Sequence, residues 1–146
     1  MTPHRILLVE DDAATREMFS GVLKDAGMDV VEAADGVIAF DAASGLSPDL
    51  VITDIAMPRM DGIELTRALR LLSSTERVPI IAVTGELAVF ARARDAGCTA
   101  VVSKPCAARD LVRLVEHFIG RDHESRTGEA LTPWAGADRR GQPRTS

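Results

Sequence analysis

The sequence is poor in several residue types that would point to other classes of protein. It contains no tyrosine, one tryptophan, two cysteines, and only two lysines against fifteen arginines. Cys98 and Cys106 lack the spacing of a metal site, so we expect both to be free thiols. No apolar run approaches the roughly 20 residues that cross a bilayer, and no signal peptide is recognisable. These absences favour a cytoplasmic protein without a membrane contact.

Positive charge is also scarce where the chain should fold. The formal net charge is −5, and residues 1–120 hold 12 Lys and Arg against 18 Asp and Glu. An acidic surface disfavours nucleic acid, because binding there requires cations that displace counterions. The 146 residues, 46% of them hydrophobic, fit one compact domain. We expect residues 1–120 to form it and the polar residues 121–146, which include Trp134, to be a disordered tail.

Apolar periodicity predicts an alternation of strands and helices. Short apolar runs that end in polar residues are typical of buried parallel strands, and helical spacing separates them. The predicted strands are residues 5–10, 29–33, 50–54, 79–84 and 100–102, and the predicted helices are residues 13–26, 37–43, 62–72, 87–96 and 108–119. Parallel strands need crossover connections, so this order predicts an α/β fold with helices on both faces of a parallel sheet.

Polar side chains stand where several of these strands end. Ligands of an open parallel sheet bind beyond the carboxyl ends of its strands. The residues at those ends are Glu10, Asp11, Asp12, Asp54, Thr84, Ser103 and Lys104. Carboxylates packed together repel one another unless a cation neutralises them, and oxygen ligands without His or Cys favour Mg²⁺ together with a phosphate. The sequence therefore predicts a magnesium and phosphate site at this edge.

Such a site can carry out phosphoryl transfer. With Mg²⁺ present, a carboxylate can attack phosphorus and form an acyl phosphate. The phosphoryl oxygens also require a cation and a hydrogen-bond donor, roles that suit Lys104 and Thr84. A flexible lysine ammonium can follow a phosphoryl group that is present only part of the time. The choice of lysine here looks specific, because the chain otherwise uses arginine as its cation. The bond from Lys104 to Pro105 can be cis, which would set how this lysine enters the site.

Four segments in this order resemble the receiver domains of response regulators. They are ILLVEDD at 6–12, LVITDIAMPRMDG at 50–62, IIAVT at 80–84 and VVSKP at 101–105, and the likeness spans roughly residues 4–119. The resemblance implies a flavodoxin-like (βα)5 three-layer sandwich with strand order 2-1-3-4-5. It also implies roles for six residues: Asp54 as phosphoacceptor, Glu10 and Asp11 as Mg²⁺ ligands with Asp54 and the carbonyl of Ala56, and Thr84 and Lys104 as contacts of the phosphoryl group.

The function that this resemblance implies is phosphoryl acceptance in a two-component system or phosphorelay, without turnover of a separate substrate. A sensor histidine kinase or histidine phosphotransfer protein would be the donor, and a downstream protein would recognise the switched surface. No output segment is recognisable after residue 120, so we expect a stand-alone receiver. Homodimers through residues 79–102 or through helix 13–26 are further candidates.

Alternatives stay open at this stage. The chain could be a receiver-like scaffold that takes no phosphate, or a fragment of a larger regulator or hybrid kinase. A haloacid-dehalogenase-like phosphatase is disfavoured, because Ala56 stands where that family has a second aspartate. Asp12 is either a helix N-cap, which we favour, or a further member of the acidic group.

Two departures from the receiver pattern concern signal output. Val101 occupies the position where many receivers carry an aromatic switch residue. The stretch from Thr84 to Lys104 is shorter than in chemotaxis-type receivers, which predicts a short or displaced fourth helix.

Overall fold

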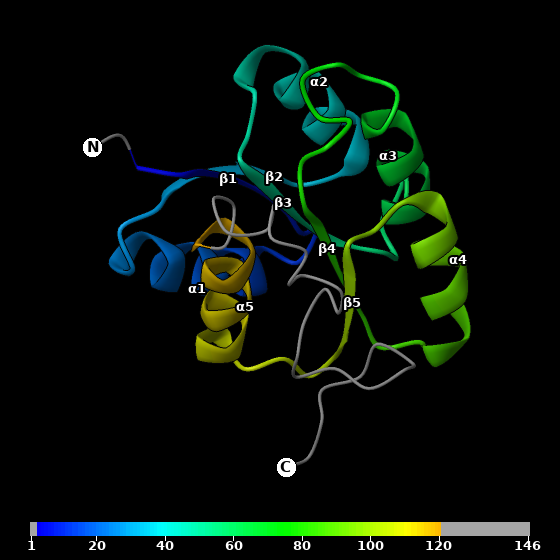
Figure 1. Cartoon of the computed structure of the whole chain (residues 1–146). Coiled ribbons are helices and arrows are strands. Elements are labelled where there is room, and N and C mark those ends of the chain that lie inside the picture. Colours follow the sequence, from blue (N-terminus) through cyan, green and yellow to red (C-terminus); the bar gives the residue numbers. More distant parts are fainter. Residues whose placement is uncertain (1–2, 121–146) are drawn as a thin grey trace.

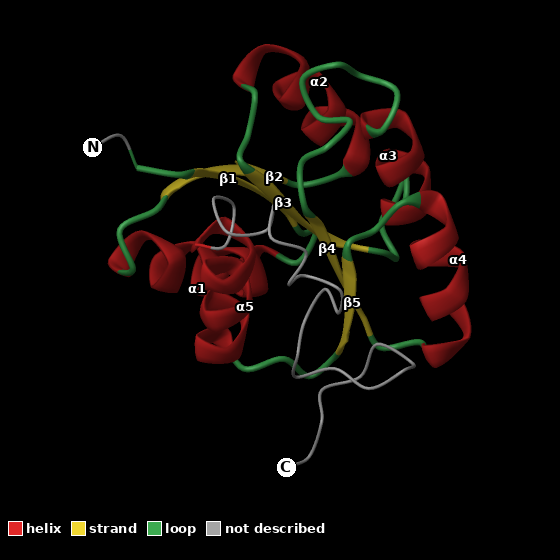
Figure 2. Cartoon of the chain, in the orientation of Figure 1, coloured by secondary structure: helices red, strands yellow, loops and turns green. Residues whose placement is uncertain are grey.

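A computed structural model describes residues 3–120 and shows five parallel strands between two layers of helices (Figures 1 and 2). The sheet has the order β2-β1-β3-β4-β5, as predicted. Its strands are β1 (Arg5–Val9), β2 (Asp29–Ala33), β3 (Leu50–Asp54), β4 (Ile80–Thr84) and β5 (Ala100–Ser103). The helices are α1 (Ala13–Asp25), α2 (Gly36–Leu46), α3 (Gly62–Leu69), α4 (Phe90–Ala96) and α5 (Ala108–Gly120), and a 3₁₀ turn, η1 (Leu87–Val89), precedes α4.

The two faces of the sheet bury separate apolar clusters. Helices α1 and α5 cover one face, and α2, α3 and α4 cover the other (Figure 1). Successive residues of a strand point to opposite faces, so Ile6 and Leu8 pack in one cluster while Leu7 and Val9 pack in the other. All five residues of β3 are buried. This central strand therefore delivers its last residue, Asp54, to the middle of the sheet edge.

Three predicted helices differ from the structure by more than one residue at an end, for local reasons. The helix predicted to reach residue 72 ends at Leu69, because the hydroxyl of Thr75 donates to the Leu69 carbonyl at 2.6 Å. Helix α2 is longer than residues 37–43, since it starts directly after its N-cap, Asp35, and ends at Leu46, before the C-cap Ser47, which has φ 52°. The predicted helix 87–96 begins as the 3₁₀ turn η1, which leaves α4 with seven residues, so the expectation of a short fourth helix is confirmed.

One arginine ties together the amino-terminal ends of β4 and β5. The guanidinium of Arg70 donates to the Gly97 carbonyl at 2.8 and 3.0 Å and to the Val78 carbonyl at 2.7 Å. These carbonyls lie just before β5 and β4, at the edge of the sheet opposite Asp54. A single charged side chain thus satisfies several backbone acceptors that no strand or helix pairs.

The two cysteines are free, as predicted. Within residues 3–120 no helix has the length and apolar character needed to cross a membrane.

Candidate functional site

Three predicted acids meet at the carboxyl edge of the sheet. Glu10 and Asp11 follow β1, and Asp54 ends β3, the strand paired with β1 through Val9 and Thr53. One carboxylate oxygen from each acid lies within 4.8 Å of the others. Glu10 and Asp54 are 3% and 5% exposed, whereas Asp11 is exposed to solvent. Such an oxygen-only set, open on one side, fits a Mg²⁺ ion that keeps some of its water.

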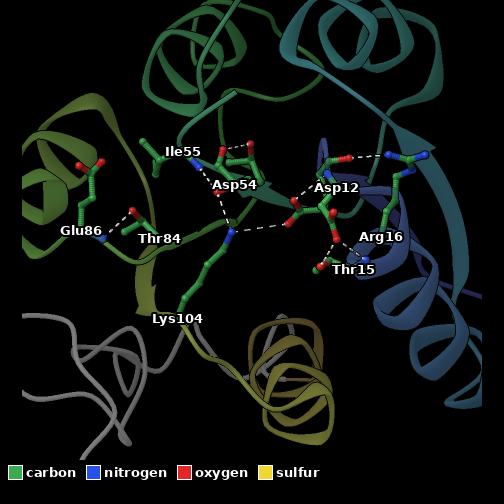
Figure 3. A network of polar contacts seen from close by, with 10 residues as sticks. Asp12, Thr15, Arg16, Asp54, Ile55, Thr84, Glu86 and Lys104 are labelled. Carbon is green, nitrogen blue, oxygen red and sulfur yellow. Dashed lines mark hydrogen bonds and ion pairs between the residues drawn. The ribbon is translucent and has the colours of Figure 1, made fainter. Parts of the chain in front are cut away.

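The backbone that follows β3 holds the Asp54 carboxylate in place. The Ile55 amide donates to Asp54 Oδ1 at 2.8 Å (Figure 3), and the Gly62 amide donates to the Ile55 carbonyl at 2.8 Å. A Cβ atom on Gly62 would overlap the Asp54 carbonyl oxygen. Only glycine therefore lets the loop after β3 fold back this closely.

Lys104 reaches across the edge from β5 to the acids. Its Nζ lies 3.3 Å from Asp54 Oδ1 and 4.0 Å from Glu10 Oε1 (Figure 3). The Lys104 amide donates to the Thr84 carbonyl at 2.8 Å, and the Lys104–Pro105 peptide bond is cis. The lysine side chain is 38% exposed, so its ammonium has room to follow a group placed on Asp54.

Thr84 ends β4 as a buried residue beside this group. Its hydroxyl oxygen accepts a hydrogen bond from the Glu86 amide at 3.1 Å, which leaves the hydroxyl hydrogen for another acceptor (Figure 3). Val101, at the position of the aromatic switch residue, is 1% exposed and packs in the cluster that contains Phe90. A valine at this depth has no ring to swing between the interior and the surface.

Asp12 is an N-cap, and the cap interpretation is confirmed. Its carboxylate accepts from the Thr15 amide at 2.9 Å and from the Thr15 hydroxyl at 2.6 Å (Figure 3). These bonds lower the pKa of Asp12. Its own amide donates to Glu10 Oε2 at 3.1 Å, so the cap also orients a neighbouring acid.

Burial dominates the electrostatics of the two inner acids. It raises the pKa of Glu10 from 4.5 to about 7, and the charge of Asp54 adds to the effect. Burial also raises the pKa of Asp54, although Lys104 opposes this. Burial therefore disfavours the charged form of both carboxylates when no metal ion is bound. A divalent ion would neutralise this charge and favour the ionised carboxylates.

Arg16 orders the acidic loop, although the sequence pattern did not reveal it. Arg16 donates to the Glu10 carbonyl at 2.7 Å, and its Nε lies 3.3 Å from Glu32 Oε1 on β2. Arg16 lies four residues after the Asp12 cap, and residues four apart share one helix face, so the spacing could have suggested that Arg16 lies near the acids. The same spacing occurs in many helices without such a contact, so it would have made Arg16 a candidate and no more.

A hollow of about 520 Å³ adjoins the acids. Asp11 and Ala56 line it together with Glu86 and Arg92, which come from the β4–α4 side. Met57 lines it as well, and both Met57 and Met60 pack against the core.

Comparison with known proteins identifies the family. A family model described as the response regulator receiver domain matches residues 6–116. The chain is 38% identical over 125 residues to the transcriptional regulatory protein PdtaR of Mycobacterium tuberculosis, which covers 84% of this chain and 60% of PdtaR. It is 29% identical to the polar-differentiation response regulator DivK of Brucella anthropi, over 81% of this chain and 98% of DivK. The chain thus spans less than two thirds of PdtaR but nearly all of DivK.

Solved structures with similar folds agree. The chemotaxis protein CheY4 of Vibrio cholerae superimposes with a TM-score of 0.76 and 31% identity, over 80% of this chain and 98% of CheY4. The receiver domain of sensor histidine kinase PA1611 from Pseudomonas aeruginosa has a magnesium ion coordinated in its active site cleft. It superimposes with a TM-score of 0.76 and 30% identity, over 82% of this chain and 99% of the PA1611 domain. The chain belongs to the response regulator receiver domains of two-component signalling, and the flavodoxin-like fold is confirmed.

Proposed function

We propose that this receiver accepts a phosphoryl group on Asp54 with Mg²⁺ held by Glu10, Asp11, Asp54 and the carbonyl of Ala56. The observation that carries the proposal is the contact of one buried carboxylate with both a lysine and two further acids: Asp54 lies 3.3 Å from Lys104 Nζ and within the 4.8 Å acidic group. A receiver-like scaffold would not need to keep this costly group of buried charges.

Each residue has a distinct task in the transfer. A carboxylate oxygen of Asp54 forms a bond to phosphorus while the bond between phosphorus and the donor's imidazole nitrogen breaks, and that nitrogen takes the bonding electrons. Mg²⁺, when bound, neutralises charge on the acids and on the phosphoryl oxygens. Lys104 supplies a second cation beside Asp54, and the hydroxyl hydrogen of Thr84 would donate to a phosphoryl oxygen.

We place the protein in the cytoplasm with two kinds of partner. The donor is the phosphohistidine of a sensor histidine kinase or of a histidine phosphotransfer protein, because this carboxylate site needs an activated phosphoryl group. A downstream protein then distinguishes the two states of the surface around Thr84 and Lys104, since the added charge changes their contacts. The membership of the family supports both assignments.

The direct test is phosphorylation by a small donor such as acetyl phosphate with Mg²⁺. The protein should gain one phosphoryl group, stable in acid and labile in base as an acyl phosphate is, on the peptide that contains Asp54. Chelation of Mg²⁺ should prevent the gain. Intact-protein and peptide mass spectrometry measure it, and an adduct on a serine, threonine or histidine would contradict the proposal.

The raised pKa of Glu10 predicts that Mg²⁺ affinity depends on pH. Below a pKa of about 7 a proton occupies the carboxyl and must leave before the ion binds, whereas above it the carboxylate is already ionised. The affinity is therefore expected to fall about tenfold from pH 8 to pH 6, as for one proton competing with one ion. Calorimetry in two buffers of different ionisation enthalpy measures both the affinity and the released proton. A constant affinity across this range would show that Glu10 ionises normally.

A further inference from the structure

The loop after β3 carries one proposed metal ligand on a stretch with few polar ties to other elements, although Ile55 is buried and Met57 and Met60 pack against the core. The backbone of this loop, residues 55–61, closes on its own segment through the bond from Gly62 N to Ile55 O. Within residues 3–120, the polar contact that joins the loop to an element other than β3 and α3 is the ion pair of Arg59 with Asp35.

Asp35 is a fixed anchor for this pair. It is 7% exposed and is the N-cap of α2, where Oδ1 accepts from the Ile38 amide at 2.9 Å. Its other oxygen, Oδ2, receives the guanidinium of Arg59. The Ile38 amide and Arg59 both lower the pKa of Asp35, so the carboxylate keeps its charge at neutral pH. Its place is set by the N-terminal cap of α2.

A second contact docks the loop beside the ion pair. The Met60 carbonyl lies so close to Gly36, the first residue of α2, that a Cβ atom there would overlap it. Arg59 itself has φ 69°, a left-handed backbone conformation that residues other than glycine rarely adopt. The loop thus takes up an unfavourable backbone angle where its arginine meets the buried carboxylate.

We propose that the Arg59–Asp35 ion pair is a positioning device that holds the Ala56 carbonyl in place for the metal before any metal binds. The inference rests on the proposed function. The three carboxylate ligands lie at the end of β3 or directly after β1, so the sheet fixes their positions. Ala56 lies in the loop, so the conformation of the loop fixes the position of its carbonyl. Ala56 lines the same hollow as Asp11. Among the described residues, Arg59 pairs with Asp35 and not with an acid of the proposed metal site. It acts through the backbone, as outer partners of metal ligands do.

Two single variants break the pair without straining the fold. Arg59→Gly removes the guanidinium and suits φ 69°, and Asp35→Asn keeps an oxygen for the Ile38 amide while removing the charge. Each should lower Mg²⁺ affinity about tenfold, the lower range for such outer partners. The double variant should lose no more than either single one, because both remove the same contact. Arg59→Lys, which keeps the charge, should recover part of the affinity.

A matched control separates this contact from a general change of charge. Asp29→Asn removes one negative charge, as Asp35→Asn does, and breaks an ion pair with Arg5 at 3.4 Å. Asp29 starts β2 at the other end of the sheet, away from the metal site. The Mg²⁺ affinity of the Asp29→Asn variant should equal that of the wild type.

Amide hydrogen exchange without metal tests the positioning itself. The amide of Gly62 should exchange faster in Arg59→Gly than in the wild type, and the Asp29 variant should leave it unchanged. Wild-type affinity and wild-type exchange in Arg59→Gly would overturn the inference, even where Asp54 accepts phosphate. A wild type that binds no Mg²⁺ would overturn the proposed function instead, and the exchange rates would still decide whether the pair holds the loop.

Discussion

Asp54→Asn is expected to take up no phosphoryl group under conditions in which the wild type takes up one. The asparagine amide has nearly the same shape but is not a nucleophile towards phosphorus, so no acyl phosphate can form. The buried backbone around it should persist, because the amide oxygen can still accept from the Ile55 amide. Intact-protein mass spectrometry after incubation with acetyl phosphate and Mg²⁺ measures the difference.

Asp61→Asn is the matched control for this variant. Asp61 lies at the end of the same loop but caps α3 by accepting from the Glu64 amide at 2.8 Å, a role that asparagine also performs. Full phosphorylation of this control is expected. An adduct that persists in Asp54→Asn would show that another residue is the acceptor.

Glu10→Gln is expected to stabilise the metal-free protein while it weakens Mg²⁺ binding. The pKa of Glu10 is raised from 4.5 to about 7 on folding, so the folded state binds the proton more tightly. Stability contributed by that proton is present below pH 4.5, falls as the pH rises to 7, and stays low above it. A neutral glutamine avoids this loss, which at pH 8 amounts to about 1–3 kcal/mol.

Urea unfolding in EDTA at pH 5 and pH 8 measures this effect, which should be large only at pH 8. Calorimetry should show at least about a tenfold loss of Mg²⁺ affinity, since one anionic ligand is gone. Asp12→Ala is the control, because it removes an adjacent acid that caps α1 and should leave metal affinity largely intact. Lower stability of Glu10→Gln at pH 8 would show that the ionised carboxylate is not costly.

The position of the acidic group could be predicted from the sequence because it depends on two general features. Apolar runs that end in acid locate the carboxyl ends of strands, and those ends share one edge of a parallel sheet. Glu10 and Asp54 meet for this reason, and Lys104 joins them from β5. The strand order itself came from the resemblance, since periodicity does not say which strands are neighbours.

Other features could not be predicted because they depend on contacts between distant residues. Helix α3 stops at Leu69 through the hydroxyl of Thr75, and no local breaker marks that end. The pair of Arg59 with Asp35 spans 24 residues and joins two loops that look independent in the sequence. The raised pKa of Glu10 arises from burial, which requires the packed structure.

The uneven attachment of α4 has a mechanical consequence. Arg70 secures its carboxyl end through the Gly97 carbonyl, while no side chain caps η1 at its start and Leu87 there is 58% exposed. The first turn is held by packing instead, because Val89 and Phe90 are 9% and 5% exposed and lie in the same apolar cluster as Val101. The Glu86 amide, just before η1, donates to the Thr84 hydroxyl. A change in the contacts of that hydroxyl therefore acts directly on the residues that lead into η1, a route that needs no aromatic side chain at position 101.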